Sequence, residues 1–200
     1  MLRSIPLLLL LPLIVRAQPA EEALAHIELI RETRAFKDSL LRHGDDSPLL
    51  PDDRPGFAGL SYYPIDLQYR LVGQMHRYGR LRQIEVPDTG GTTLTMERFG
   101  RLYFSWREKE YWLEVYRSLE NGQLEAFFRD ESSGSTTYSG GRYVGIGPLQ
   151  DGLYLIDFNM AYNPYCDYNP AYICPVPPPH NALPFSVEAG ERTYGTDLAN

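Results

Sequence analysis

Apolar residues recur at every third or fourth position between Glu21 and His43, with Glu, Arg and Lys between them. The recurring set is Leu24, Ile27, Ile30, Phe36, Leu40 and Leu41. This period predicts one amphipathic helix. Gly44 and the Ser47-Pro48 pair end it, because the residue before a proline is disfavoured in helical backbone. Residues 45–56 are rich in proline and aspartate and predict a surface connector.

Beyond residue 56 the apolar period shortens to two, which is typical of strands. The alternating stretches cover residues 69–76, 82–86, 92–96, 102–106, 111–115, 124–128, 137–144, 153–158 and 185–187. Turn residues separate them, and Asn121-Gly122 is a strong hairpin signal. About eight short strands predict a mainly β fold, a single antiparallel β-sandwich or barrel-like meander. The N-terminal helix packs against it, and a long proline-rich loop, residues 159–184, closes one end.

The first 17 residues predict a secretory signal peptide. A short basic start, Met1-Leu2-Arg3, precedes an apolar run from Ile5 to Val15 that is too short to span a bilayer. Small residues at the usual offsets predict cleavage after Ala17. The expected mature protein therefore lies in the periplasm or outside the cell and has no membrane span. Its predicted parts are a helix and connector, residues 18–56, and a β domain, residues 57–200.

The charge balance bears on the choice of partner. The formal net charge is −7, and removal of residues 1–17 takes away two arginines and no acid. Nucleic acid and anionic lipid surfaces need clustered Lys and Arg, so neither is expected as a partner. Arg77, Arg80 and Arg82 come nearest to such a cluster, and we place them on the solvent face of a strand.

Three stretches carry a family resemblance: FAGLSYYPIDLQYRL (57–71), FFRDESSGSTTYSGGRYV (127–144) and IDFNMAYNPYCDYNPAYICPVPPPHNALPFSVEAGERTY (156–194). Together they resemble the bacterial and archaeal family catalogued as domain of unknown function 1684. The most specific features are DFNxAYNPxC, the C-x7-C spacing and the CPxPPP run. The chain departs from the family at His180, where an acid is usual, and at Ser132, where Thr is frequent. The family has no established activity, so the resemblance implies membership without a mechanism.

Cys166 and Cys174 are the only two cysteines, and seven residues separate them. In an exported protein such a pair is expected to form a disulfide that braces the loop. A metal site is the alternative, but only His180 and Asp167 lie nearby as further ligands. We expect a structural disulfide, no metal and no cofactor.

The polar residues around the loop allow two interpretations. Their side chains could simply satisfy backbone amides of irregular turns. Alternatively, they could form a polar cluster at one end of the sheet that binds a ligand or supports acid–base chemistry. The cluster would hold Arg142, Asp157, Asn159, Tyr162, Asn163 and Glu188. For Arg142 the alternative is a structural ion pair with Asp130 or Asp157.

Recognised catalytic motifs are absent from the sequence. It has no G-x-S-x-G or H-E-x-x-H motif, and Gly145-Ile146-Gly147 lacks the third glycine of a dinucleotide-binding loop. The first functional hypothesis is therefore a non-catalytic binding or structural module of the cell envelope, whose partner is an unknown small molecule or envelope component. The alternative is a hydrolase of envelope or extracellular material that uses Asp157 or Glu188 with Arg142.

Overall fold

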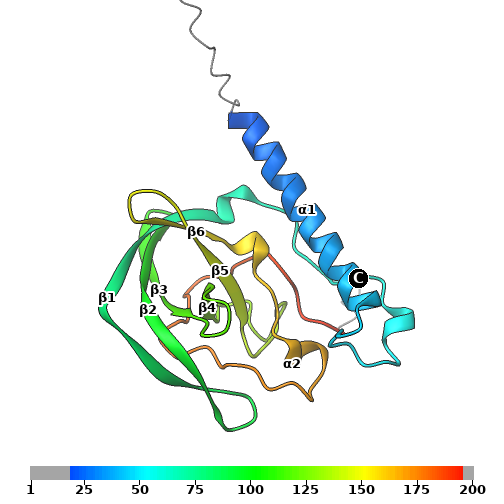
Figure 1. Cartoon of the computed structure of the whole chain (residues 1–200). Coiled ribbons are helices and arrows are strands. Elements are labelled where there is room, and N and C mark those ends of the chain that lie inside the picture. Colours follow the sequence, from blue (N-terminus) through cyan, green and yellow to red (C-terminus); the bar gives the residue numbers. More distant parts are fainter. Residues whose placement is uncertain (1–18, 196–200) are drawn as a thin grey trace, which may run out of the picture.

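The computed structural model describes residues 19–195 of the chain. The predicted signal peptide, residues 1–17, lies outside these described residues. Helix α1 (Pro19–His43) confirms the predicted N-terminal helix and runs along the outside of the β sheet (Figure 1). Within residues 19–195, no helix has the length and apolar character needed to cross a membrane.

Six antiparallel strands form the body of the molecule. Each pairs with the next along the chain, and β1 also pairs with β6, so the sheet closes on itself as a barrel (Figure 1). The strands are β1 (Arg70–Pro87), β2 (Thr93–Trp106), β3 (Lys109–Arg117), β4 (Leu124–Phe128), β5 (Arg142–Pro148) and β6 (Leu153–Asp157). The predicted mainly antiparallel β architecture with an N-terminal helix is therefore confirmed.

The strand count is six in the described residues, where the sequence predicted about eight. Predicted strands 69–76 and 82–86 are both parts of β1, and 92–96 and 102–106 are both parts of β2. A bulge between Arg77 and Arg82 breaks the alternation without ending the strand. Gly100, predicted as a separator, lies inside β2. A glycine is needed at this position because His76 O leaves no room for a side chain. The predicted strand 185–187 is irregular, and β5 begins only at Arg142.

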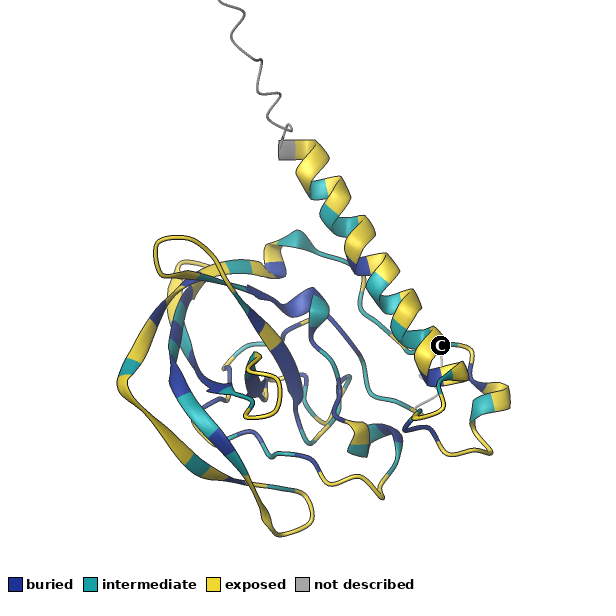
Figure 2. Cartoon of the chain, in the orientation of Figure 1, coloured by how far each residue is buried: buried dark blue, intermediate teal, exposed yellow. Residues whose placement is uncertain are grey.

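The main core fills the inside of the closed sheet. Leu102 and Phe104 of β2 and Leu113 and Val115 of β3 point into this core from alternate positions. In β3 the intervening Glu114 and Tyr116 are buried as well, so this strand is covered on both faces. Figure 2 shows buried positions along the strands, whereas α1, the hairpin ends and much of β1 carry exposed positions. Phe158 packs into the same core directly after β6.

Helix α1 buries a different face from the one predicted. Ile30 and Leu41 are buried, but Leu24, Phe36 and Leu40 are at least half exposed. The inner face instead follows the sequence Ile30, Arg34, Lys37 and Leu41, in which the two charged residues are partly buried between two buried apolar ones. The apolar pattern alone therefore gave the helix and missed its orientation.

The chain after β6 has little regular structure. It contains the 3₁₀ helix η3 (Phe158–Met160), the short helix α2 (Tyr165–Tyr168) and isolated bridges. In this structure Cys166 and Cys174 are free thiols, so the predicted disulfide is not formed. The two residues are nevertheless in contact, because the Cys166 N–H donates to Cys174 Sγ at 3.3 Å.

Candidate functional site

A cleft of about 590 Å³ separates helix α1 from the outer face of β4, β5 and β6. This volume lies in the range of small-molecule sites. One wall carries α1 side chains, and the opposite wall carries Tyr162 and Tyr165 from the segment after β6. Outward-facing positions of the sheet form its floor, since Glu125 of β4 is the direct partner of Gly145 in β5. We call this feature the helix–sheet cleft.

The floor of the helix–sheet cleft is flat because β5 places glycines there. Gly145 and Gly147 both face the cleft. A Cβ added at Gly145 would meet no atom within 4 Å, so the space above it is open. Glycine weakens a strand interior and often marks close approach of another group. This floor is therefore suited to a ligand that lies against the sheet.

The first charged pair in the cleft joins α1 to the end of β6. His26 Nε2 lies 2.6 Å from Asp157 Oδ2, and both side chains are largely buried. The other carboxylate oxygen accepts two hydrogen bonds at 2.9 Å, from the backbone N–H and the Nδ2 of Asn159. Both carboxylate oxygens of Asp157 thus already have hydrogen-bond partners within the protein.

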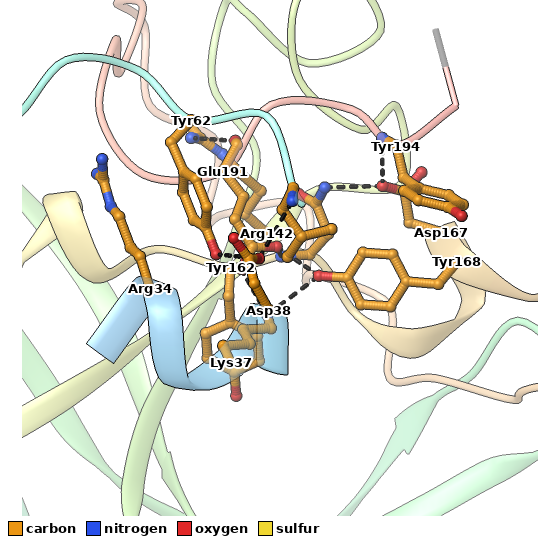
Figure 3. Close-up of polar contacts among 12 residues, drawn as sticks. Arg34, Lys37, Asp38, Tyr62, Arg142, Tyr162, Asp167, Tyr168, Glu191 and Tyr194 are labelled. Carbon is orange, nitrogen blue, oxygen red and sulfur yellow. Dashed lines mark hydrogen bonds and ion pairs between the residues drawn. The ribbon is translucent and has the colours of Figure 1, made fainter. Parts of the chain in front are cut away.

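The second charged pair joins α1 to the last part of the chain. Lys37 Nζ donates to Glu191 Oε1 at 2.5 Å and to Tyr168 Oη at 3.0 Å (Figure 3). The other oxygen of Glu191 accepts from the Tyr168 hydroxyl and from the Asn163 N–H. Glu191 is almost completely buried, so these bonds replace its hydration.

Arg34 and Tyr162 complete the polar lining. Arg34 donates to the carbonyl oxygens of Tyr63 and Asn159 and stacks over the ring of Tyr62 at 4.5 Å. Tyr162 donates its hydroxyl to Glu125 at 2.5 Å. Burial raises the pKa of the Tyr162 hydroxyl, with the Glu125 charge acting in the same direction, so this hydroxyl stays protonated at neutral pH.

The charges that line the cleft nearly cancel. Arg34 and Lys37 are positive, and the three carboxylates of Glu125, Asp157 and Glu191 leave a formal balance of −1 with His26 neutral. Each of these groups has a hydrogen-bond or ion-pair partner within the protein. Every charged group of the cleft therefore already has at least one partner among the described residues, and Arg34 is held by carbonyl oxygens with its Nε left without a partner.

The predicted polar cluster is divided by the sheet. Asp157, Asn159 and Tyr162 line the helix–sheet cleft. Arg142 alternates with outward-facing Tyr143 and is fully buried on the inner side. Arg142 pairs there with Asp130 at 2.7 Å and donates to the carbonyl oxygens of three residues, Val187, Ala189 and Glu191. The predicted alternative, a structural pair with Asp130, is the arrangement found.

The two remaining candidates also lie away from the cleft lining. Asn163 is buried and donates its Nδ2 to Asp167 at 2.7 Å and to the Arg192 carbonyl at 2.7 Å. Glu188 is exposed and is not part of the cleft. The side-chain amides of Asn163 and Asn159 donate to backbone carbonyl oxygens of irregular segments, as the first interpretation of this loop expected.

Sequence reasoning missed the residues that α1 and the chain end supply: His26, Arg34, Lys37 and Glu191. A signal was present, because Arg34 and Lys37 fall in register between Ile30 and Leu41. A charged residue on an otherwise apolar helix stripe needs a buried partner. Among residues 19–195, no group of three or more His, Cys, Asp or Glu side chains is arranged to hold a metal ion.

The chain belongs to the family described as "Protein of unknown function (DUF1684)", which matches residues 55–192. This confirms the resemblance found in the sequence. A solved structure with a similar fold is the solution NMR structure of an uncharacterised protein from Haloarcula marismortui. The two are 31% identical with a TM-score of 0.69, and the match covers 90% of this chain and 99% of that chain. No curated protein matches the chain.

Proposed function

We propose that this protein is a non-catalytic binding module that holds a small, uncharged, polar ligand in the helix–sheet cleft. The observation that carries the proposal is an open glycine floor beneath a lining whose charged groups all hold ion-pair or hydrogen-bond partners within the protein. Charged groups that are already paired favour neither an anion nor a strongly cationic ligand. Hydroxyl and amide groups of a neutral ligand can still form hydrogen bonds with the remaining lone pairs and N–H groups of the cleft lining.

The aromatic residues refine the ligand class. Tyr62, Tyr162 and Tyr165 line the cleft, and Tyr165 is about half exposed. Tyrosine offers a flat apolar face together with a hydroxyl, which suits a ring that carries polar substituents. A short neutral saccharide, including an N-acetylated cell-wall sugar, combines these properties. This supports the expectation of an envelope component as the partner.

The test is a thermal-shift screen of the full chain against neutral mono- and disaccharides, including N-acetylated sugars. A ligand that binds the folded state raises the melting temperature. Gly145→Leu fills the cleft floor without meeting another atom at Cβ. Gly56→Leu is the matched control, because Gly56 lies in the 3₁₀ helix η1 (Arg54–Gly56), outside the cleft, and also has open space at Cβ.

The expected result is a ligand-induced shift in the native protein and in Gly56→Leu, and its loss in Gly145→Leu. Two outcomes would contradict the proposal. One is the absence of any shift across the neutral sugars, and the other is an equal shift in Gly145→Leu.

We further propose that the protein acts in the periplasm or outside the cell. The apolar run from Ile5 to Val15 and the small residue Ala17 support this localisation.

A second candidate is a hydrolase of envelope or extracellular material, which the His26–Asp157 contact favours. A carboxylate that orients an imidazole is a common device for activating water as a nucleophile. Exchanging either residue, by His26→Ala or Asp157→Asn, should then abolish release of reducing ends from cell-wall saccharides. Hydrolysis that persists in both variants would exclude this function for the pair.

A further inference from the structure

Strand pairing gathers arginines that are far apart in the sequence. Arg80 and Arg82 of β1 and Arg98 of β2 line a second, smaller cavity of about 290 Å³, together with Tyr78 and Gly79. Arg82 and Arg98 are direct partners across the two strands. Like charges directly opposite each other destabilise a sheet unless a counter-charge is present. We call this cavity the arginine pocket.

The bulge in β1 creates the arginine pocket. Residues 78–81 lie between the paired positions Arg77 and Arg82, opposite a single unpaired residue of β2. The bulge turns Tyr78 so that its hydroxyl donates to Glu114 Oε2 at 3.0 Å. Arg80 and Arg82 are then exposed on the outer surface. A bulge commonly re-aims side chains in this way, and here it directs two arginines to one cavity.

Too few counter-charges surround these arginines. Glu114 is fully buried, and its carboxylate binds Arg98 through both oxygens and lies 3.5 Å from Arg101. Arg80 and Arg82 have no hydrogen bond or ion pair with any residue in the described part of the chain. Arg98 and Arg101 therefore already share the one carboxylate of Glu114, and Arg80 and Arg82 are left without a counter-charge among the described residues. This local excess of positive charge stands in a chain of net charge −7.

We propose that the arginine pocket binds a phosphate-type oxyanion, carried by a phosphate ester. The planar guanidinium fork matches phosphate oxygens and binds them in pairs. Arg98 is already held in place by Glu114 and by stacking over Tyr78 at 4.6 Å. Binding of a ligand therefore costs little conformational entropy at this side chain. Arg80 and Arg82 supply the two free positive charges.

The arginine pocket could not be predicted from the sequence, because strand pairing brings its arginines together. Arg77, Arg80 and Arg82 are too few for a cluster when only neighbours in the chain are counted. The β1–β2 ladder adds Arg98, which lies directly opposite Arg82 and lines the same cavity. The phosphate ester itself can be a soluble molecule or the headgroup of an anionic lipid, since both present the same oxygens.

The test measures binding of phenyl phosphate by calorimetry at low salt, where ion-mediated affinity is strongest. We expect Arg80→Gln with Arg82→Gln to lower the affinity by about tenfold or more, because charge-assisted hydrogen bonds are lost. Arg31→Gln with Lys109→Gln removes the same charge from exposed positions elsewhere and should leave affinity unchanged. All four side chains are exposed, so each variant should fold.

A second pair of variants tests the pocket by adding a group. A Cβ at Gly79 meets no atom within 4 Å, so Gly79→Asp places a carboxylate in the pocket without a clash. It should abolish binding, whereas Gly79→Ala should retain it. Gly145→Leu should bind phenyl phosphate like the native protein, which separates this inference from the proposed function of the helix–sheet cleft.

Sedimentation with vesicles identifies the source of the phosphate group. Binding to phosphatidylglycerol vesicles but not to phenyl phosphate, sensitive to the two arginine substitutions, assigns the pocket to a lipid headgroup. Binding to phenyl phosphate assigns it to a soluble ester. The inference is overturned if the native protein binds neither probe, or if both arginine substitutions leave binding unchanged.

Discussion

At the scale of single residues, Asp167 shows how burial makes stability depend on pH. Burial raises the pKa of its carboxyl to about 6, an effect to which the charge of Glu191 adds. Hydrogen bonds from the Tyr194 N–H and Asn163 Nδ2 act in the opposite direction without cancelling it. Both donors contact the same oxygen, Oδ2, so an amide oxygen could replace it.

Asp167→Asn should therefore stabilise the protein at neutral pH. The carboxyl of Asp167 keeps its proton in the folded state up to about pH 6, whereas the unfolded chain releases it near pH 4. The contribution of Asp167 to the free energy of unfolding therefore falls as pH rises from about 4 to 6. After allowance for solvent screening, we expect a gain of about 1–2 kcal/mol in the free energy of unfolding at pH 7. Urea unfolding of both proteins between pH 4 and 7 measures it. A difference that does not grow with pH would contradict the expectation.

Arg142 was a candidate ligand contact from the sequence, and the structure gives it a core position. Its guanidinium and the Asp130 carboxylate are both completely buried. Arg142→Met should lower the free energy of unfolding by about 3–5 kcal/mol, because Asp130 is left as an unpaired buried charge. Chemical denaturation measures the loss. Arg31→Met, at an exposed position of α1, is the control, and equal stabilities of the two variants would refute the structural role.

At the scale of elements, α1 is attached to the sheet largely by polar contacts. His26, Arg34 and Lys37 each contact the barrel or the chain end. Much of the helix's apolar surface, by contrast, faces solvent (Figure 2). The docking of this helix, and with it one wall of the helix–sheet cleft, therefore depends on buried charge pairs.

Lys37→Met should loosen this attachment. It removes the cation from Glu191, and we expect a loss of about 2–4 kcal/mol in the free energy of unfolding, since Lys37 itself is partly exposed. Amide hydrogen exchange should accelerate in α1 more than in β2 and β3. Adding Glu191→Gln should restore much of the stability, because one amide oxygen can still accept from Tyr168 and Asn163. If exchange in α1 stays unchanged, Lys37 does not hold the helix.

The helix and the strands also show which elements could be predicted from the sequence and which could not. Helix α1 was predictable because apolar periodicity and the Gly44–Pro48 break are local signals. The strands of the sheet were predictable as β structure, but their number was not. Bulges and a buried Gly100 interrupt the alternation inside β1 and β2, and only the partner strand shows that the ladder continues.

At the scale of the whole molecule, both candidate sites join distant parts of the chain. The helix–sheet cleft combines His26 and Lys37 from the first helix with Asp157 and Glu191 near the other end. The sequence identified Asp157, Asn159 and Tyr162 because they cluster in one motif. It could not supply their partners, since nothing in a single sequence links positions 131 or 154 residues apart. It also grouped Arg142 with them, although the pleat directs that residue to the opposite face.

We expect the protein to be exported from the cytoplasm, and removal of residues 1–17 should lower its mass. We expect the protein from a periplasmic or secreted fraction to begin at Gln18, because the segment ending at Ala17 has the pattern of a signal peptide. In that compartment Cys166 and Cys174, which already touch, should be joined by a disulfide. Intact mass spectrometry with and without reductant measures both changes.

Cytoplasmic expression of residues 18–200 provides the matched control for this prediction. It should yield two free thiols, as in the structure. Burial raises the pKa of the Cys174 thiol to about 12, so alkylation of this residue at neutral pH should be slow, because the thiolate is the reactive form. A full-length mass in the exported fraction would contradict the signal peptide. Two free thiols there would leave the loop to be braced by its hydrogen bonds, as between Cys174 and Thr89.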